Sequence, residues 1–220
     1  MTEPRREFEQ QLEIIEAKVI ELFAMMAEDL PKATEALLSG APEILGQLAE
    51  RERVIDALYP EVEELAATEI LLQAPVASDL RYLLTVLRVV PEIERSHDLV
   101  MQIASQASHL ISQDLSPRAR GLVQLMGDLA TGMWRQATDA WYQRDRDTAD
   151  GLRKSDEEMD ELHASLVAEL ASGEMRIPVA MEMTLAGHAY ERLGAHAVNI
   201  CRRVVYLAGS APGPSGAPPA

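Results

Sequence analysis

The sequence contains Pro91-Glu-Ile-Glu-Arg-Ser-His-Asp98 and, in its second half, His188-Ala-Tyr-Glu-Arg-Leu-Gly-Ala195. Each stretch places a Glu-Arg pair, Glu94-Arg95 or Glu191-Arg192, late in an apolar run with helical spacing. The two pairs are 97 positions apart, which indicates that one unit of the chain was duplicated. We therefore expect two halves with the same fold.

A second pair of carboxylates recurs upstream, as Glu52 with Asp56 and as Asp156 with Asp160, 104 positions later. The two offsets differ by seven residues, which is about two turns of an α-helix. A difference of two turns leaves each carboxylate pointing from the same helix face. The repeated spacing therefore indicates a structural origin.

The composition favours helices packed on helices. Of the 220 residues, 47% are apolar and only 4% are aromatic, and Leu, Ala, Val and Met dominate the apolar set. The formal net charge of −16 argues against binding a nucleic-acid backbone over a broad surface, so cations or basic protein surfaces are the expected partners. The single cysteine, Cys201, cannot form an intrachain disulfide and is expected to be a buried thiol.

The sequence also predicts where the protein resides. No run of about eighteen uncharged apolar residues occurs, so we expect no transmembrane helix. The first residues are charged and lack the apolar block of a signal peptide. These features predict a soluble cytoplasmic protein.

Apolar residues at helical spacing predict an all-α fold of two three-helix bundles side by side, with no sheet. Pro31 either starts a new turn or kinks the first helix, and Ala74-Pro75-Val-Ala-Ser-Asp79 has the chemistry of a helix start, with Ser and Asp as caps. We expect the first bundle in residues 1–113, the second in 114–207 and a disordered Pro/Gly-rich tail in 208–220. The six expected helices span about 7–38, 43–72, 75–111, 118–144, 145–171 and 178–207.

The carboxylate pairs form the candidate site. Residues four apart share a helix face, and like charges there repel unless a cation or a basic partner neutralises them. Carboxylate oxygens suit Mg, Mn, Ca or Fe, with Zn also possible, whereas a solvated acidic face is the simpler alternative. The first half supplies two complete pairs and the second half only three carboxylates, because Ala195 stands where the fourth should be. The candidate metal ligands are Glu52, Asp56, Glu94, Asp98, Asp156, Asp160 and Glu191.

Histidines leave a second interpretation open. Glu94 with His97, and Asp160 with His163, have the i, i+3 spacing of ferritin-like di-iron proteins, so an oxidase or ferroxidase is an alternative. Exposed histidines are the simpler explanation of that spacing. A third possibility is a helical adaptor that binds no metal.

Polar and aromatic residues near the second Glu-Arg pair have simple structural explanations. His196 and Asn199 could supplement the depleted second site, but polar residues satisfied between helices are the preferred interpretation. Trp134 and Trp141 are seven apart, share a face and are expected in the core. No Gly-rich phosphate loop or nucleophilic triad is present in the sequence, so catalysis is not expected.

Three motifs together resemble the PhoU family of phosphate-specific transport system accessory proteins: Gln73-Ala-Pro-Val-Ala-Ser-Asp-Leu-Arg81, Glu94-Arg-Ser-His-Asp98 and Glu191-Arg-Leu-Gly-Ala-His-Ala-Val-Asn-Ile200. The resemblance implies two three-helix bundles whose acidic motifs bind metal ions, with His97 and His196 as less certain ligands. The chain departs from the family's usual Glu-Arg-Ile-Gly-Asp in both repeats.

The same resemblance implies a function. Members of the family restrain phosphate uptake and the phosphate-starvation response, through contacts with the phosphate ABC transporter ATPase and a membrane sensor kinase. Divalent or trivalent ions (Fe, Mn, Mg or Zn) are the implied cofactors, and a homodimer is expected.

Overall fold

The computed structural model describes residues 3–108, 114–144, 148–173 and 175–208. All of the long elements in these ranges are helices and none is a strand, which confirms the all-α prediction. No described helix has both the length and the apolar sequence needed to cross a membrane. The helices are α1 (Glu3–Ser39), α2 (Pro42–Gln73), α3 (Ala77–Ser105), the short 3₁₀-helix η1 (Gln106–Ser108), α4 (Pro117–Gln143), α5 (Thr148–Leu170) and α6 (Ile177–Ala208).

Most helix boundaries differ from the expected ones by a few residues. Pro31 lies inside a continuous α1, which agrees with the alternative in which the first helix continues to about residue 38. α3 ends at Ser105 and η1 follows, whereas the helix was expected to reach residue 111; residues 109–113 lie outside the described ranges. Ala208 still belongs to α6, so the expected tail cannot begin there, and residues 209–220 lie outside the described ranges.

The expected cap of the third helix is wrong. Val76 is the N-cap, and no side chain caps the helix. Ala74 and Ala77 both have positive φ, so the chain turns sharply between α2 and α3 and places Ser78 and Asp79 inside the first turn. Asp79 instead accepts a hydrogen bond from Arg5 Nη1 at 3.0 Å and so ties α3 to the start of α1.

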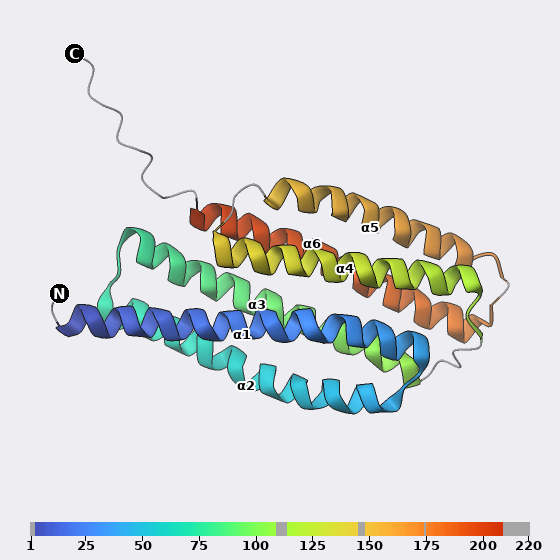
Figure 1. The fold of residues 1–220 in the computed structure, drawn as a ribbon, viewed down its shortest axis with the longest axis horizontal. Helices are drawn as coiled ribbons and strands as arrows, with labels where there is room; N and C mark the ends of the chain where they lie inside the picture. The colour runs from blue at the N-terminus through green and yellow to red at the C-terminus, as the bar shows by residue number, and fades with distance from the viewer. Residues whose placement is uncertain (1–2, 109–113, 145–147, 174, 209–220) are drawn as a thin grey trace, which may run out of the picture.

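The six long helices form two triples, α1–α3 and α4–α6, as expected (Figure 1). α1 packs against α4, and α3 packs against α6, so the buried residues of the two triples join in one hydrophobic core. Four of the six helices therefore bury apolar side chains both within their own triple and between the triples. The sequence indicated the triples, but the packing between them is a property of the structure.

Aromatic side chains fill the contact between the triples. Phe23 of α1 lies 6.5 Å from Trp134 and 5.8 Å from Trp141 of α4, measured between ring centroids. Tyr82 of α3 approaches Trp141 at 6.3 Å from the other side. Both tryptophans are fully buried, as predicted, and Trp134 Nε1 donates a hydrogen bond to the carbonyl of Leu193 on α6 at 3.1 Å. Such aromatic pairs stabilise packing beyond the area they bury. Cys201 is also buried, as expected.

α1 and α4 approach each other closely at Gly127. A Cβ atom on Gly127 would lie 2.5 Å from Oγ1 of Thr34. Thr34 is buried, and its hydroxyl is hydrogen-bonded at 2.8 Å to the hydroxyl of Tyr190 on α6. Because Thr34 is β-branched and held in place, it cannot turn away. The contact between the triples therefore requires glycine at this position.

We predict that Gly127→Ala lowers the free energy of unfolding by about 1 to 3 kcal/mol, because the added methyl group overpacks the helix contact. The matched control is Gly132→Ala on the same helix, where a Cβ would meet no atom within 4 Å. That control should leave stability unchanged or raise it by up to about 1 kcal/mol, since alanine is the better helix former. Urea denaturation measures the free energy of unfolding of both variants. An equal change in the two variants would contradict the packing argument.

Candidate functional site

The carboxylates of the first half lie on two adjacent helices. Glu52 and Asp56 are on α2, and Glu94 and Asp98 are on α3, which packs against α2. Glu52 and Glu94 are partly buried, whereas Asp56 and Asp98 are exposed. Each helix therefore presents one carboxylate near the helix contact and one toward solvent.

Asp56 of α2 lies close enough to act on the carboxyl group of Glu94, whereas the described residues show no such effect from Glu52. Burial raises the pKa of the Glu94 carboxyl group most, and the neighbouring charge of Asp98 raises it further. Asp56 and Glu63 of α2 also raise this pKa, and Arg95 opposes them. Because the charged form of Glu94 is disfavoured by burial and by other carboxylates, a cation placed among them would be stabilising.

Two further residues of α2, Tyr59 and Glu63, belong to this cluster and were not predicted from the sequence. Glu63 lies seven positions after Asp56, which is the same helix face, so the spacing could have identified it. Burial raises the pKa of the Tyr59 phenol most, followed by its hydrogen bond to Glu63 and by the charges of Glu63 and Glu94. The acidic face of α2 is thus longer than the motif that identified it.

The second half brings together three carboxylates from α5 and α6. Burial raises the pKa of the Asp156 carboxyl group most, and Asp160 and Glu191 raise it further. Oδ1 of Asp156 lies 3.5 Å from where a Cβ on Gly194 would be, so this carboxylate reaches α6. Asp156, Asp160 and Glu191 therefore lie near one another, and their binding of a metal ion stays a prediction.

The second cluster also has a positively charged side chain nearby, that of Arg202. Arg202 lowers the pKa of Asp156, opposing the nearby carboxylates. It lies seven residues after Ala195, about two turns along the same face of α6. At the equivalent position of the first half, 97 residues earlier, stands Ser105. The second cluster thus lacks one carboxylate and gains one positive charge.

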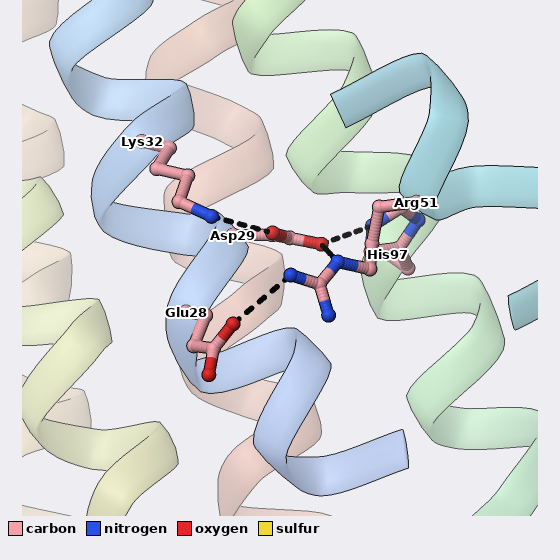
Figure 2. A network of polar contacts seen from close by, with 5 residues as sticks. All are labelled: Glu28, Asp29, Lys32, Arg51 and His97. Carbon is pink, nitrogen blue, oxygen red and sulfur yellow. Dashed lines mark hydrogen bonds and ion pairs between the residues drawn. The ribbon is translucent and has the colours of Figure 1, made fainter. Parts of the chain in front are cut away.

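His97 lies in a buried polar network that crosses the first triple (Figure 2). Its Nε2 is 3.3 Å from Oδ2 of Asp29 on α1, and the two side chains are 2% and 1% exposed. Arg51 Nε of α2 lies 3.6 Å from the same oxygen, and Lys32 Nζ lies 3.6 Å from Oδ1. Arg51 also donates a hydrogen bond to the exposed Glu28 at 3.0 Å. One buried carboxylate thereby joins three helices.

This network corrects the expectation of exposed histidines, which is wrong for His97. Asp29 gave no sign of its role in the sequence, because its partners come from α2 and α3. With Nε2 directed at Asp29, His97 is part of the structural framework beneath the α2–α3 carboxylates. A buried carboxylate held in this way is costly to deprive of its partner, because the remaining polar group is left unsatisfied.

Two histidines lie near the second cluster. His163 of α5 has a buried Nε2 with no hydrogen-bond partner among the described residues, and its ring lies 6.3 Å from that of His188. His188 Nδ1 lies 3.0 Å from Oε2 of Glu191, its neighbour on α6. Glu191 thus has a partner on its own helix.

His196 and Asn199 bridge α6 to α3, as the preferred interpretation predicted. Nδ1 of His196 is hydrogen-bonded to Oγ of Ser96 at 2.8 Å. Nδ2 of Asn199 donates to Oε1 of Glu92 at 3.1 Å. Burial lowers the pKa of His196 most, against the opposing charge of Glu92.

In the described ranges, no three side chains of His, Cys, Asp or Glu are arranged to hold one metal ion. Neighbouring carboxylates are close enough to raise the pKa of Glu94 and of Asp156, yet the described side chains do not form a closed ligand shell. Their chemistry fits hard cations such as Mg, Mn or Fe, because all the donors are carboxylate oxygens. The exposed Asp56 and Asp98 would have to rotate toward Glu94 to complete such a shell.

The PhoU domain family matches the chain twice, over residues 19–107 and 123–204. Each match covers most of one helical triple, which is the arrangement that duplication predicts. The phosphate-specific transport system accessory protein PhoU homolog 1 of Mycobacterium leprae is 30% identical over 207 residues, covering 93% of either chain. The homolog 2 of Mycobacterium tuberculosis is also 30% identical, covering 93% of this chain and 97% of its own.

Solved structures share the architecture. The crystal structure of PhoU from Pseudomonas aeruginosa superposes with a TM-score of 0.84 at 25% identity, covering 91% of this chain and 98% of that one. The phosphate transport system regulatory protein PhoU from Streptococcus pneumoniae superposes with a TM-score of 0.82, also at 25% identity, covering 91% and 96%. The likeness therefore extends over both triples.

We predict that Asp29→Ala lowers the free energy of unfolding by roughly 2 to 3 kcal/mol, because it leaves His97 buried without its partner. The loss stays below that of a fully buried ion pair, since Arg51 and Lys32 remain partly hydrated. The control is Glu28→Ala, which removes an exposed partner of Arg51 and should cost under about 1 kcal/mol. Equal losses in urea denaturation would show that burial of Asp29 is not what matters.

Proposed function

The chain belongs to the PhoU domain family, and we propose on that premise that it restrains phosphate uptake and the phosphate-starvation response. It would do so through contacts with other proteins, and not by catalysing a reaction. The relatives that it matches over nearly their whole length are named accessory proteins of phosphate-specific transport. The observation that carries the proposal is that both triples match the family.

The expected partners are the phosphate ABC transporter ATPase and a membrane sensor kinase, with the protein acting in the cytoplasm as a homodimer. A net charge of −16 supports docking to basic surfaces, because opposite charges steer association. The di-iron oxidase alternative is not favoured, because His97 faces Asp29 within the core of the first triple. Such docking should weaken as salt screens the exposed charges.

We propose further that the first half binds a divalent or trivalent cation through Glu52, Asp56, Glu94 and Asp98. The raised pKa of Glu94 supports this, since neighbouring carboxylates disfavour its charged form until a cation arrives. When bound, such a cation would neutralise this acidic face and change its charge toward a partner. The ligand set is made entirely of oxygen donors, which fits Fe, Mn or Mg better than Zn.

The second half should bind metal more weakly. Ala195 removes one oxygen donor from the set formed by Asp156, Asp160 and Glu191, and Arg202 supplies a competing positive charge. Because Arg202 already neutralises part of the negative charge, a metal ion would bind at this cluster with a less favourable free energy. The two halves would thus differ in affinity despite their common origin.

We predict that the double variant Glu94→Gln with Asp98→Asn binds fewer metal ions per chain, measured by elemental analysis after native purification. The metal-free variant should be at least as stable as the metal-free parent at pH 7, because the repulsion at Glu94 is removed. The pKa of Glu94 is higher in the folded protein than its ordinary value of 4.5. Its unfavourable contribution in the parent therefore grows as pH rises through the raised pKa and is absent below 4.5.

A second variant adds the carboxylate that the second cluster lacks at position 195. Ala195→Asp should increase metal uptake, because it completes the second set of carboxylates. Unchanged stoichiometry in the double variant, or two equal sites in the unmodified protein, would contradict the assignment. A stability gain confined to low pH would contradict the electrostatic argument, since the repulsion is present only at higher pH.

We predict that deleting the gene raises phosphate uptake, or starvation-response expression, when phosphate is plentiful. Uptake of radiolabelled phosphate and expression of a starvation-inducible reporter measure the two effects. Complementation with the intact gene should restore repression. An unchanged response in a cell with no related protein would reject the regulatory role and leave the fold unaffected.

A further inference from the structure

A small recess opens between α3 and α6. Its volume is about 120 Å³, and it is lined by Arg88, Val89, Glu92, Asn199, Ile200 and Arg203. One water molecule in the liquid occupies about 30 Å³, so the recess has room for roughly four waters or one small oxyanion. Its lining comes from both triples, and most of it is polar or charged.

Two arginines at this recess have no carboxylate partner. Neither Arg88 nor Arg203 makes an ion pair or a side-chain hydrogen bond with another described residue, although the chain has 36 acidic residues. Elsewhere, arginines such as Arg51 and Arg144 are paired with glutamates at 3.0 Å. Arg88 and Arg203 are both exposed, as are other arginines without a carboxylate partner among the described residues, such as Arg6 and Arg135. What distinguishes Arg88 and Arg203 is that they line one recess together.

The remaining polar groups of the recess are held in defined positions. Asn199 donates from Nδ2 to Oε1 of Glu92 at 3.1 Å and accepts at Oδ1 from Arg202 at 3.3 Å. This orients the Glu92 carboxylate in the recess while the guanidinium donors of Arg88 and Arg203 stay available. The lining thus offers several N–H donors and one carboxylate acceptor.

The positive charge extends along the same seam. Arg95 and Arg192, the arginines of the two repeated Glu-Arg pairs, both act on His196 and oppose its protonation. His196 itself bridges to Ser96 on α3 at 2.8 Å, so these charges lie near the α3–α6 contact. Four arginines therefore lie along the α3–α6 contact, together with the carboxylate of Glu92.

We propose that this recess binds inorganic phosphate between the guanidinium groups of Arg88 and Arg203. Guanidinium presents paired N–H donors that match the oxygens of a phosphate. Phosphate at neutral pH still carries a proton, which Glu92 can accept in a hydrogen bond, whereas sulfate carries none. Glu92 therefore favours phosphate over sulfate of similar size.

This site would let the regulator proposed above bind phosphate as its signal. Only this regulatory interpretation rests on the proposed function. Binding itself does not depend on it, because it follows from the lining of the recess. If phosphate binds but gene deletion changes nothing, the site stands and the regulatory role fails. If deleting the gene raises phosphate uptake but phosphate does not bind the protein, the regulatory role stands and the binding site is rejected.

The test is calorimetric titration of the full-length protein with phosphate, after removal of metals by a chelator and at constant ionic strength. Removing metals excludes phosphate bound through ions at the carboxylates. We expect saturable binding of one phosphate per chain, with sulfate binding at least tenfold more weakly. Arg88→Gln with Arg203→Gln should weaken phosphate binding at least tenfold.

The matched control is Arg6→Gln with Arg135→Gln, which changes the net charge equally at two exposed arginines outside the recess. It should bind phosphate as the parent does, and circular dichroism should show every variant folded. Glu92→Gln should reduce the difference in affinity between phosphate and sulfate.

Four outcomes would overturn the proposal: no saturable phosphate binding in the parent, unchanged binding in the recess variant, an equal loss in the control, or binding of ATP without binding of free phosphate. Equal affinity for phosphate and sulfate would overturn the role given to Glu92.

Discussion

The packing of Phe23 against Trp134 and Trp141 is the contact on which the two halves depend. It joins the first helix of one triple to the first helix of the other, and all three rings are buried. Gly127 makes the same contact possible further along, where α4 approaches Thr34 too closely for a side chain. Because the halves share one core, a change at this contact affects both triples.

The acidic residues gather where α2 packs against α3 and where α5 packs against α6. In these two clusters, burial and like charges raise the pKa of Glu94 and of Asp156. Beneath the first cluster, Asp29 anchors His97 in a network spanning α1, α2 and α3 (Figure 2). The proposed metal ligands thus lie on helices held rigidly by groups that take no part in ligation.

The two halves differ at several charged positions. Arg202 offsets the charge of Asp156, whereas the first half has Ser105 at the equivalent position. The α3–α6 recess is not a repeated feature either. Positions equivalent to Arg88 and Arg203 hold Leu185 and Gln106, so the recess needs unlike contributions from the two halves. The two halves thus share a scaffold, as duplication predicts, and differ in the residues at these positions.

The sequence by itself determined the helical fold, the two triples and the recurring carboxylates, because helical periodicity and spacing are local properties that packing preserves. It also indicated the buried tryptophans and the polar bridge made by His196 and Asn199. Only the tertiary structure decided the partner of His97, the role of Glu63 and the pairing of α3 with α6. Asp29 and His97 are 68 residues apart, and Arg88 and Arg203 are 115 apart, so no local pattern connects them. Such contacts depend on how helices cross, which is set by complementary side-chain packing over the whole core.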